Sequence, residues 1–228
     1  MKITSRSVRL AIALVLIFGA GSYLLGWSSL LSVRSVEILG APTKESQLAV
    51  ARSLNIATGD KLARVDPRSL SNRLRSIEWI ETSQVSRNWI NGKVAISITI
   101  RKPIALYNEP GKPQVVLDAS GKTFATPAEI ADGLPKVSAK SVEGGLAAIE
   151  VFTSLPESFS KNIDRMSAAR ADNFLIYGQF QGQDLRIIWG NGDDIDLKVQ
   201  VIEALLQREE NKNLRMIDVS APHAPIVK

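Results

Sequence analysis

Cysteine is absent from the 228 residues, and His223 is the only histidine. Without cysteine the chain cannot form a disulfide, a thiolate zinc site or a cysteine nucleophile. One histidine cannot supply a multi-histidine metal centre. The sequence also lacks the G-x-S-x-G, P-loop and H-E-x-x-H motifs, which removes the usual signatures of α/β-hydrolases, P-loop nucleotide-binding proteins and zinc proteases. We therefore expect no metal and no cofactor.

Charge is unevenly placed along the chain. The formal net charge is +5, and three basic residues stand before the first apolar run: Lys2, Arg6 and Arg9. The remaining 25 basic and 23 acidic residues nearly balance. Five arginines then concentrate in a short stretch: Arg64, Arg68, Arg73, Arg75 and Arg87. Acidic residues interrupt this stretch and no aromatic platform surrounds it, which favours a solvated helix face over a nucleic-acid site. Contact with anionic lipid stays open.

An uncharged run extends from Leu10 to Leu31. Roughly 20 helical residues cross a bilayer core, and Tyr23 and Trp27 suit a headgroup layer. The alternative is a cleaved signal peptide, but the run is long and no A-x-A cleavage site follows it. The sequence predicts a cytoplasmic tail over residues 1–9, a transmembrane helix over 10–31, and export of the rest, because the basic residues precede the run.

Hydrophobic periodicity and turn signals predict a small β-α-α-β-β unit over residues 32–101. Thr43 and the Asp66-Pro67 pair are helix-start signals, and Asn91-Gly92 is a hairpin turn. The strongest alternation runs from Val94 to Ile100. The predicted elements are strand 33–39, a helix ending near Leu54, a helix from Pro67, and strands 80–88 and 93–101. Pro103 then marks a boundary.

Residues 102–221 are predicted to form a β-rich domain with one or two helices, which makes the fold class α+β. The predicted strands are 104–107, 115–118, 123–124, 173–177, 185–189 and 214–220, and the predicted helices are 142–153 and 196–208. We expect residues 222–228 to be a flexible tail.

Two groups of side chains invite a functional interpretation. Asp193, Asp194 and Asp196 follow Gly192 and carry ligand types that suit Ca²⁺ or Mg²⁺. Their spacing matches no EF-hand loop, and a turn into a helix N-terminus, where acidic residues are favoured, explains them better. The tryptophans at 79, 89 and 189 are expected to be core or strand-pair anchors, with a partner hot spot as the alternative.

A series of short segments follows a set order along the chain: VRSVEILG at 33–40, GDKL at 59–62 with Asp66, IEWI at 77–80, VSRNW at 85–89, KPIALY at 102–107, VLDASGKTF at 116–124, LP at 134–135, Lys198, and IDV at 217–219. In this order, the segments resemble the FtsQ/DivIB family of bacterial cell-division proteins. The chain departs from the family pattern at Glu78, Ile90 and Ile100, which stand where the family commonly has proline, proline and an acidic residue.

The resemblance implies a single-pass membrane protein with a polypeptide-transport-associated (POTRA) domain and a β domain, located at the division septum. It further implies a non-catalytic scaffold that links early and late division proteins. The implied partners are small bitopic coiled-coil proteins of the FtsB/DivIC and FtsL type, other division membrane proteins and the lipid bilayer, but not nucleic acid. Family binding by strand addition falls on Met216, Ile217, Asp218, Val219 and Ser220. A membrane-anchored sensor or cell-wall enzyme is the alternative.

Overall fold

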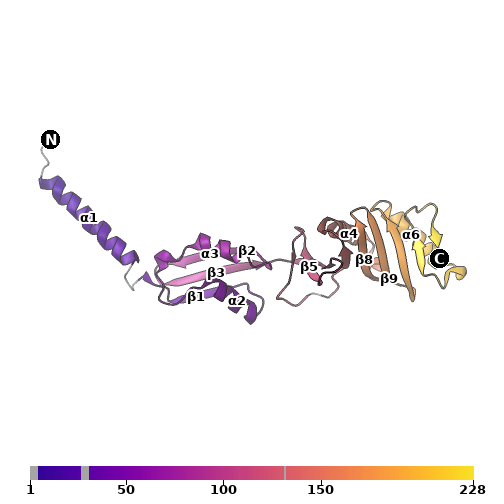
Figure 1. Ribbon diagram of the computed structural model, residues 1–228, viewed down its shortest axis with the longest axis horizontal. Coiled ribbons are helices and arrows are strands. Elements are labelled where there is room, and N and C mark those ends of the chain that lie inside the picture. Colours follow the sequence, from indigo (N-terminus) through magenta and orange to yellow (C-terminus); the bar gives the residue numbers. More distant parts are fainter. Residues whose placement is uncertain (1–4, 27–30, 131) are drawn as a thin grey trace. The chain divides into compact units, whose positions relative to one another are not determined.

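The computed structural model describes residues 5–26, 31–130 and 132–228 and, within the first helix, the side chains of residues 11–23. Contacts between residues divide the chain into two compact units, Met1–Arg101 and Lys102–Lys228 (Figure 1). Each unit builds its own sheet, so we describe each by itself. The fold is α+β, with a POTRA-like unit followed by a β-rich one.

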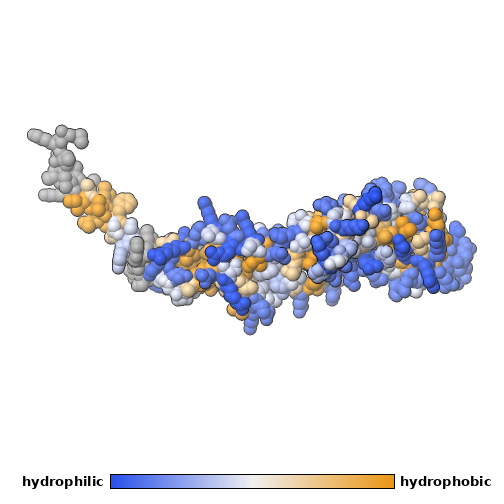
Figure 2. Space-filling model, viewed as in Figure 1, coloured by the Kyte–Doolittle hydropathy of each residue, from blue (hydrophilic) through white to orange (hydrophobic). Residues whose placement is uncertain are grey.

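The first helix does not match the predicted membrane span. Helix α1 is described from Ser5 to Gly26, so it takes in Arg6 and Arg9, which lie before the predicted span. Figure 2 shows apolar side chains gathered on its described part, where Phe18 is 73% exposed. Across the residues that the structure describes, no helix has both the length and the apolar character needed to cross a membrane. The predicted transmembrane helix over 10–31 is therefore wrong, and Lys2 and Trp27 lie outside the described residues.

The first unit is a three-stranded sheet in the order β1-β3-β2, with β1 parallel and β2 antiparallel to β3. Its elements are β1 (Ser35–Leu39), α2 (Lys44–Leu54), η2 (Leu62–Arg64), α3 (Pro67–Leu74), β2 (Ile80–Asn88) and β3 (Lys93–Ile100). The buried side chains of Val94, Ile96 and Ile98 alternate along β3, as the predicted pattern requires. Along the chain the strands and α-helices follow the predicted order β-α-α-β-β, with η2 between the two helices.

Local signals in the sequence set the helices of this unit. Thr43 caps α2 through a capping box with Ser46, which satisfies N–H groups that have no partner in the first turn. Asp66 caps α3 by accepting hydrogen bonds from the N–H groups of Arg68 and Ser69, with Pro67 at the first helical position. Both predicted helix starts are confirmed.

The second unit is a nine-stranded sheet in the order β12-β11-β10-β9-β8-β7-β4-β5-β6. Its elements are β4 (Pro103–Asn108), β5 (Val115–Asp118), β6 (Thr123–Phe124), β7 (Lys136–Ala139), α4 (Val142–Ser154), α5 (Glu157–Ser160), β8 (Ile163–Arg170), β9 (Asn173–Phe180), β10 (Gln183–Gly190), α6 (Ile195–Leu206), η3 (Glu209–Asn211), β11 (Met216–Asp218) and β12 (Ile226–Val227). Strand β11 pairs parallel to β10 and antiparallel to β12.

One hydrophobic core joins the helices of this unit to its sheet. Ile187 and Trp189 on β10 and Val199 and Ile202 on α6 are buried in the same cluster, which also takes in α4. Three strands were not predicted: β7, β8 and β12. Because β12 lies within residues 222–228 and pairs with β11, the predicted flexible tail is corrected to a segment that contains a strand.

Candidate functional site

The predicted partner-binding residues lie next to one end of the nine-stranded sheet, at β11 and the two residues after it. Their backbone groups alternate between two neighbours. The Met216 N–H donates to the Lys228 carbonyl at 3.0 Å, and the Val219 N–H donates to the Ile188 carbonyl at 2.9 Å. Because this alternation has a period of two, the N–H of Asp218 faces β12 and that of Ile217 faces β10.

Side chains on this strand divide in the same way between core and surface. Ile217 and Val219 are fully buried in the core, whereas Met216 and Asp218 are half-buried. The Asp218 carboxylate accepts hydrogen bonds from the Ser220 N–H at 2.9 Å and from its hydroxyl at 2.6 Å. Asp218 thus closes the end of the strand with a local turn of the kind that aspartate favours, so Ser220 is held in a fixed position.

Strand β12 covers the outer edge of β11. Ile217 lies opposite Val227, and Asp218 lies opposite Ile226. The Lys228 N–H donates to the Met216 carbonyl at 3.0 Å, and the Lys228 carbonyl also accepts from the Arg215 N–H at 2.8 Å. The outermost strand at this end of the sheet is therefore β12, whereas the sequence placed β11 there. The only signal for β12 was the β-branched pair Ile226-Val227 after a proline.

A buried lysine on α6 holds the turn after β10, next to this edge of the sheet. Lys198 on α6 is 1% exposed, and its Nζ donates to both the carbonyl and the side-chain Oδ1 of Asn191, each at 2.9 Å. Burial lowers the pKa of Lys198, and the nearby Asp194 and Asp193 partly oppose this. Asn191 follows Gly190, where an added Cβ would lie 2.8 Å from the Ser220 Cβ. Lys198 thus fixes the turn that packs against Ser220.

The three aspartates of the same turn do not gather into a metal site. In the described part of the chain, no group of three or more histidine, cysteine, aspartate or glutamate side chains is placed to hold a metal. Asp194 stands at the N-cap of α6 with a φ of 54°, and Asp196 lies in the first helical turn. The turn interpretation fits this geometry.

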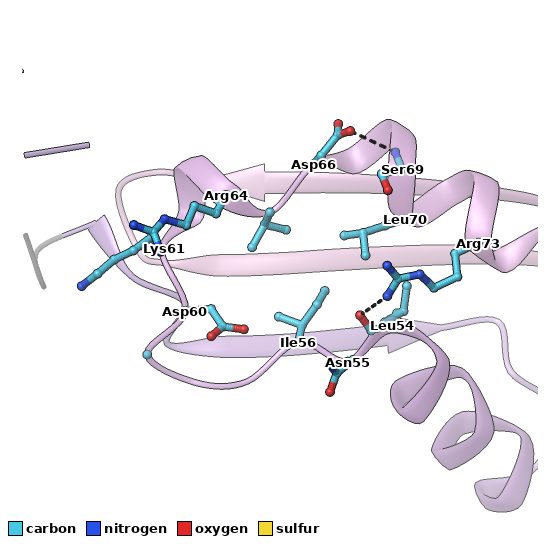
Figure 3. A pocket seen from close by; sticks show the side chains of 12 residues that line it. Leu54, Asn55, Ile56, Asp60, Lys61, Arg64, Asp66, Ser69, Leu70 and Arg73 are labelled. Carbon is cyan, nitrogen blue, oxygen red and sulfur yellow. Dashed lines mark hydrogen bonds between the residues drawn. The ribbon is translucent and has the colours of Figure 1, made fainter. Parts of the chain in front are cut away.

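A pocket of about 450 Å³ in the first unit lies beside α2, η2 and α3 (Figure 3). Arg73, which lines it, donates to the Leu54 carbonyl at 3.1 Å, and Asp66 is occupied as the cap of α3. Outside the pocket lining, Arg87 donates to the carbonyls of Leu62 and Val65 at 2.9 and 2.7 Å. These two arginines of the predicted basic stretch hold loops and helix ends, which is a structural role.

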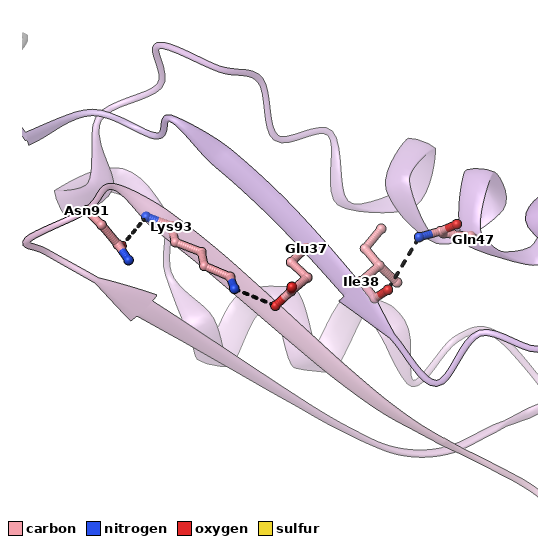
Figure 4. Close-up of polar contacts among 5 residues, drawn as sticks. All are labelled: Glu37, Ile38, Gln47, Asn91 and Lys93. Carbon is pink, nitrogen blue, oxygen red and sulfur yellow. Dashed lines mark hydrogen bonds and ion pairs between the residues drawn. The ribbon is translucent and has the colours of Figure 1, made fainter.

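Polar contacts within the first unit join β1 to β3 and to α2 (Figure 4). The Lys93 Nζ lies 2.7 Å from a Glu37 carboxylate oxygen, and Gln47 donates to the Ile38 carbonyl at 3.3 Å. Surface ion pairs of this kind contribute little to stability. They tie α2 and β3 to β1 and offer no arrangement for catalysis.

The tryptophans differ from one another in exposure. Trp79 and Trp189 are buried, as predicted for core anchors. Trp89 is 38% exposed at the β2–β3 hairpin, with the Arg87 guanidinium 5.0 Å from its ring centroid, and Ile90 beside it is 91% exposed. Trp89 is therefore a surface side chain, and the anchor interpretation does not hold for it.

The fold and the sequence define a class of protein that carries an FtsQ-type POTRA domain, because the family model of that domain matches residues 31–101.

Three relatives extend the likeness to the second unit. The cell division protein FtsQ of Streptomyces griseus is 31% identical over 84% of this chain and 92% of its own length. The cell division protein FtsQ of Streptomyces collinus is 26% identical over 96% of this chain and 86% of its own length. That of Mycolicibacterium smegmatis is 30% identical over 90% of this chain and 60% of its own length. The chain belongs to the FtsQ family of cell division proteins.

Proposed function

We propose that this protein is a non-catalytic scaffold of the division machinery, linking early and late division proteins at the septum through its second unit. Membership of the FtsQ family supports the role in cell division. The observation that carries the proposal is the C-terminal edge of the nine-stranded sheet, where Met216 and Asp218 direct their backbone groups away from β10 and toward the two-residue strand β12, the outermost strand at this edge. An edge strand is a template for another chain, because its N–H and C=O groups can bond a further strand.

The proposed partners are the small bitopic coiled-coil division proteins of the FtsB/DivIC and FtsL type. Strand addition requires only a short extended segment from the partner. Main-chain hydrogen bonds give the affinity, and alternate side chains give the specificity. Residues Met216 to Ser220 make up the proposed site on this chain, with Ile217 and Val219 anchoring it in the core.

A proline substitution tests this proposal, since proline removes one N–H from the ladder and fixes φ. The Asp218 N–H faces β12 rather than β10, so we expect Asp218→Pro to weaken the β11–β12 edge while the second unit stays folded, and to abolish capture of an FtsB/DivIC-type partner. Asp218→Ala is the matched control, because it also loses the side-chain bonds to Ser220 but keeps the N–H. Capture is measured by pull-down with the full chain, and folding by circular dichroism.

Two results separate the possible outcomes. Loss of capture by Asp218→Pro with retention by Asp218→Ala supports strand addition. Equal capture by both folded variants places partner recognition elsewhere. A fluorescent fusion of the full chain tests the location independently, and a uniform signal along dividing cells would contradict a septal scaffold.

A further inference from the structure

The turn between β2 and β3 exposes two apolar side chains next to each other. Ile90 is 91% exposed and Trp89 is 38% exposed, and both stand on residues 88–92, which we call the hairpin tip. A single apolar residue on a protein surface is ordinary. Two on one turn, with cations around them, indicate a surface outside the unit that covers them.

Hydrogen bonds hold the hairpin tip in one conformation. The Asn88 side-chain Oδ1 accepts from the N–H groups of Ile90 and Asn91 at 3.0 and 3.3 Å, and the Gly92 N–H donates to the Asn88 carbonyl at 3.0 Å. Asn91 in turn accepts from the Lys93 N–H at 3.0 Å (Figure 4). The fold of the first unit therefore keeps Ile90 in solvent, because the turn is fixed on both sides of it.

The hairpin tip lies against the start of the first unit, where the chain arrives from α1. The Gly92 carbonyl accepts the Arg34 N–H at 2.8 Å, and an added Cβ on Gly92 would lie 2.6 Å from the Ser32 carbonyl oxygen. Ser32 comes six residues after Gly26, the last described residue of α1, and that length of chain spans at most about 20 Å. Helix α1 also exposes apolar side chains along its described part, with Phe18 at 73%.

Basic side chains surround the hairpin tip. The Arg87 guanidinium lies 5.0 Å from the Trp89 ring centroid, and a backbone bridge places Lys61 beside Ser32. The carboxylates among them are engaged within the unit, Glu37 with the Lys93 Nζ at 2.7 Å and Asp60 with the Ala57 N–H at 2.8 Å. The basic residues at this end of the unit are Arg34, Lys61, Arg64, Arg87 and Lys93. Positive charge therefore exceeds negative charge around the two exposed apolar side chains.

We propose that the hairpin tip contacts an anionic lipid surface, with Trp89 and Ile90 among the headgroups and the basic residues against the lipid phosphates. Tryptophan is enriched at membrane–water interfaces, and anionic lipids attract basic residues held near them. A protein partner fits the tip less well, because a standard protein interface buries about 800 Å² on each side and two apolar side chains on a turn offer far less. The contact lies at the lipid surface and requires no helix that crosses the bilayer.

A fluorescent label on the hairpin tip tests this contact. The chain has no cysteine, so Ile90→Cys carries a single environment-sensitive nitrobenzoxadiazole label in the full chain. The control label stands at Thr99→Cys, an exposed position near the other end of β3, roughly 20 Å from the tip at about 3.4 Å per residue. The vesicles consist of phosphatidylcholine alone or of phosphatidylcholine and phosphatidylglycerol in equal parts, each with a nitroxide-labelled lipid that quenches emission at the headgroup level.

On the vesicles that contain phosphatidylglycerol, we expect the label at position 90 to shift to shorter wavelength and to lose emission to the nitroxide. The label at position 99 is expected to do neither. Arg34→Gln is expected to weaken sedimentation of the full chain with these vesicles by about fivefold, the contribution of one basic residue near an anionic surface. Arg75→Gln is the matched control, because it removes the same charge before the start of β2, at the other end of the β2–β3 ladder, where a screening length of about 10 Å separates it from the lipid.

Four results would overturn the inference. The full chain fails to bind either vesicle, or it binds while the label at position 90 keeps its emission. Quenching at both positions, or equal weakening by both arginine variants, would mean that the tip is not the contact. A label at position 90 that responds to isolated cell membranes but not to pure lipid vesicles would assign the tip to a protein partner. All of these leave the scaffold function standing, because its partner site lies on the second unit. Circular dichroism of each labelled or substituted chain confirms that it is folded.

Discussion

Gly190→Ala is expected to lower the stability of the second unit, because Gly190 packs closely against Ser220 of the proposed partner site. Gly190 ends β10 with a φ of 77°, a conformation that costs an L-residue about 1–2 kcal/mol. An added Cβ would lie 2.8 Å from the Ser220 Cβ and 2.9 Å from its Cα, and overpacking of this kind costs about 1–3 kcal/mol. Both costs fall on one substitution, so we expect a loss of about 2–5 kcal/mol from a total stability of about 5–15 kcal/mol.

Gly192→Ala is the matched control two residues further on. Gly192 does not have a positive φ, and an added Cβ there would lie 3.4 Å from Val151 Cγ2, which is close to ordinary contact. We therefore expect an effect below about 1 kcal/mol. Urea unfolding followed by circular dichroism gives the free energies, and hydrogen–deuterium exchange assigns the loss to β10 and β11. Equal losses for the two variants would refute the argument from backbone conformation and close approach.

Three further predictions concern the core, a helix cap and a buried charge. Ile217→Ala is expected to destabilise the second unit by about 2–5 kcal/mol, because it opens a cavity at a fully buried site, and a urea midpoint equal to that of the unchanged chain would contradict this. Asp66→Ala is expected to cost the first unit about 0.5–2 kcal/mol by removing the cap of α3, measured as a lower melting temperature, whereas Glu81→Ala, which removes an exposed carboxylate on β2, should cost less. Burial lowers the pKa of Lys198 in the folded chain below its ordinary value of 10.5. Between that lowered pKa and 10.5 the unfolded chain binds more protons than the folded chain, so the contribution of Lys198 to stability rises with pH up to 10.5. Lys198→Met should remove this rise, while the opposite contribution of Tyr107, whose pKa is raised by burial, is common to both proteins and cancels in their difference.

Sequence patterns located the elements whose signals are local. Thr43, Asp66 and Asn91-Gly92 each act within a few residues, and the structure confirms the helix starts and the hairpin that they predicted. Strand β8 was missed because its only buried side chains are those of Met166 and Ala168, among polar and charged neighbours that obscure the alternation.

Features that depend on distant residues could not be predicted in this way. The pairing of β12 with β11 joins two short segments across a proline-containing turn, and two residues give no periodicity. Lys198 is buried because Asn191 accepts its hydrogen bonds, a partnership that composition cannot reveal. The prediction from the uncharged run at Leu10–Leu31 failed because it relied on the absence of charge, whereas the described helix α1 includes the basic residues Arg6 and Arg9.

Photo-crosslinking in dividing cells tests the central claim most directly. A photoreactive amino acid replaces Met216 at the C-terminal edge in the full chain, and the control replaces Thr123 on β6, at the opposite edge of the same sheet. Mass spectrometry identifies what each position captures. We predict that position 216 crosslinks to a small bitopic coiled-coil division protein and that position 123 does not. Capture of that protein from position 123 alone would contradict recognition at the β11 edge.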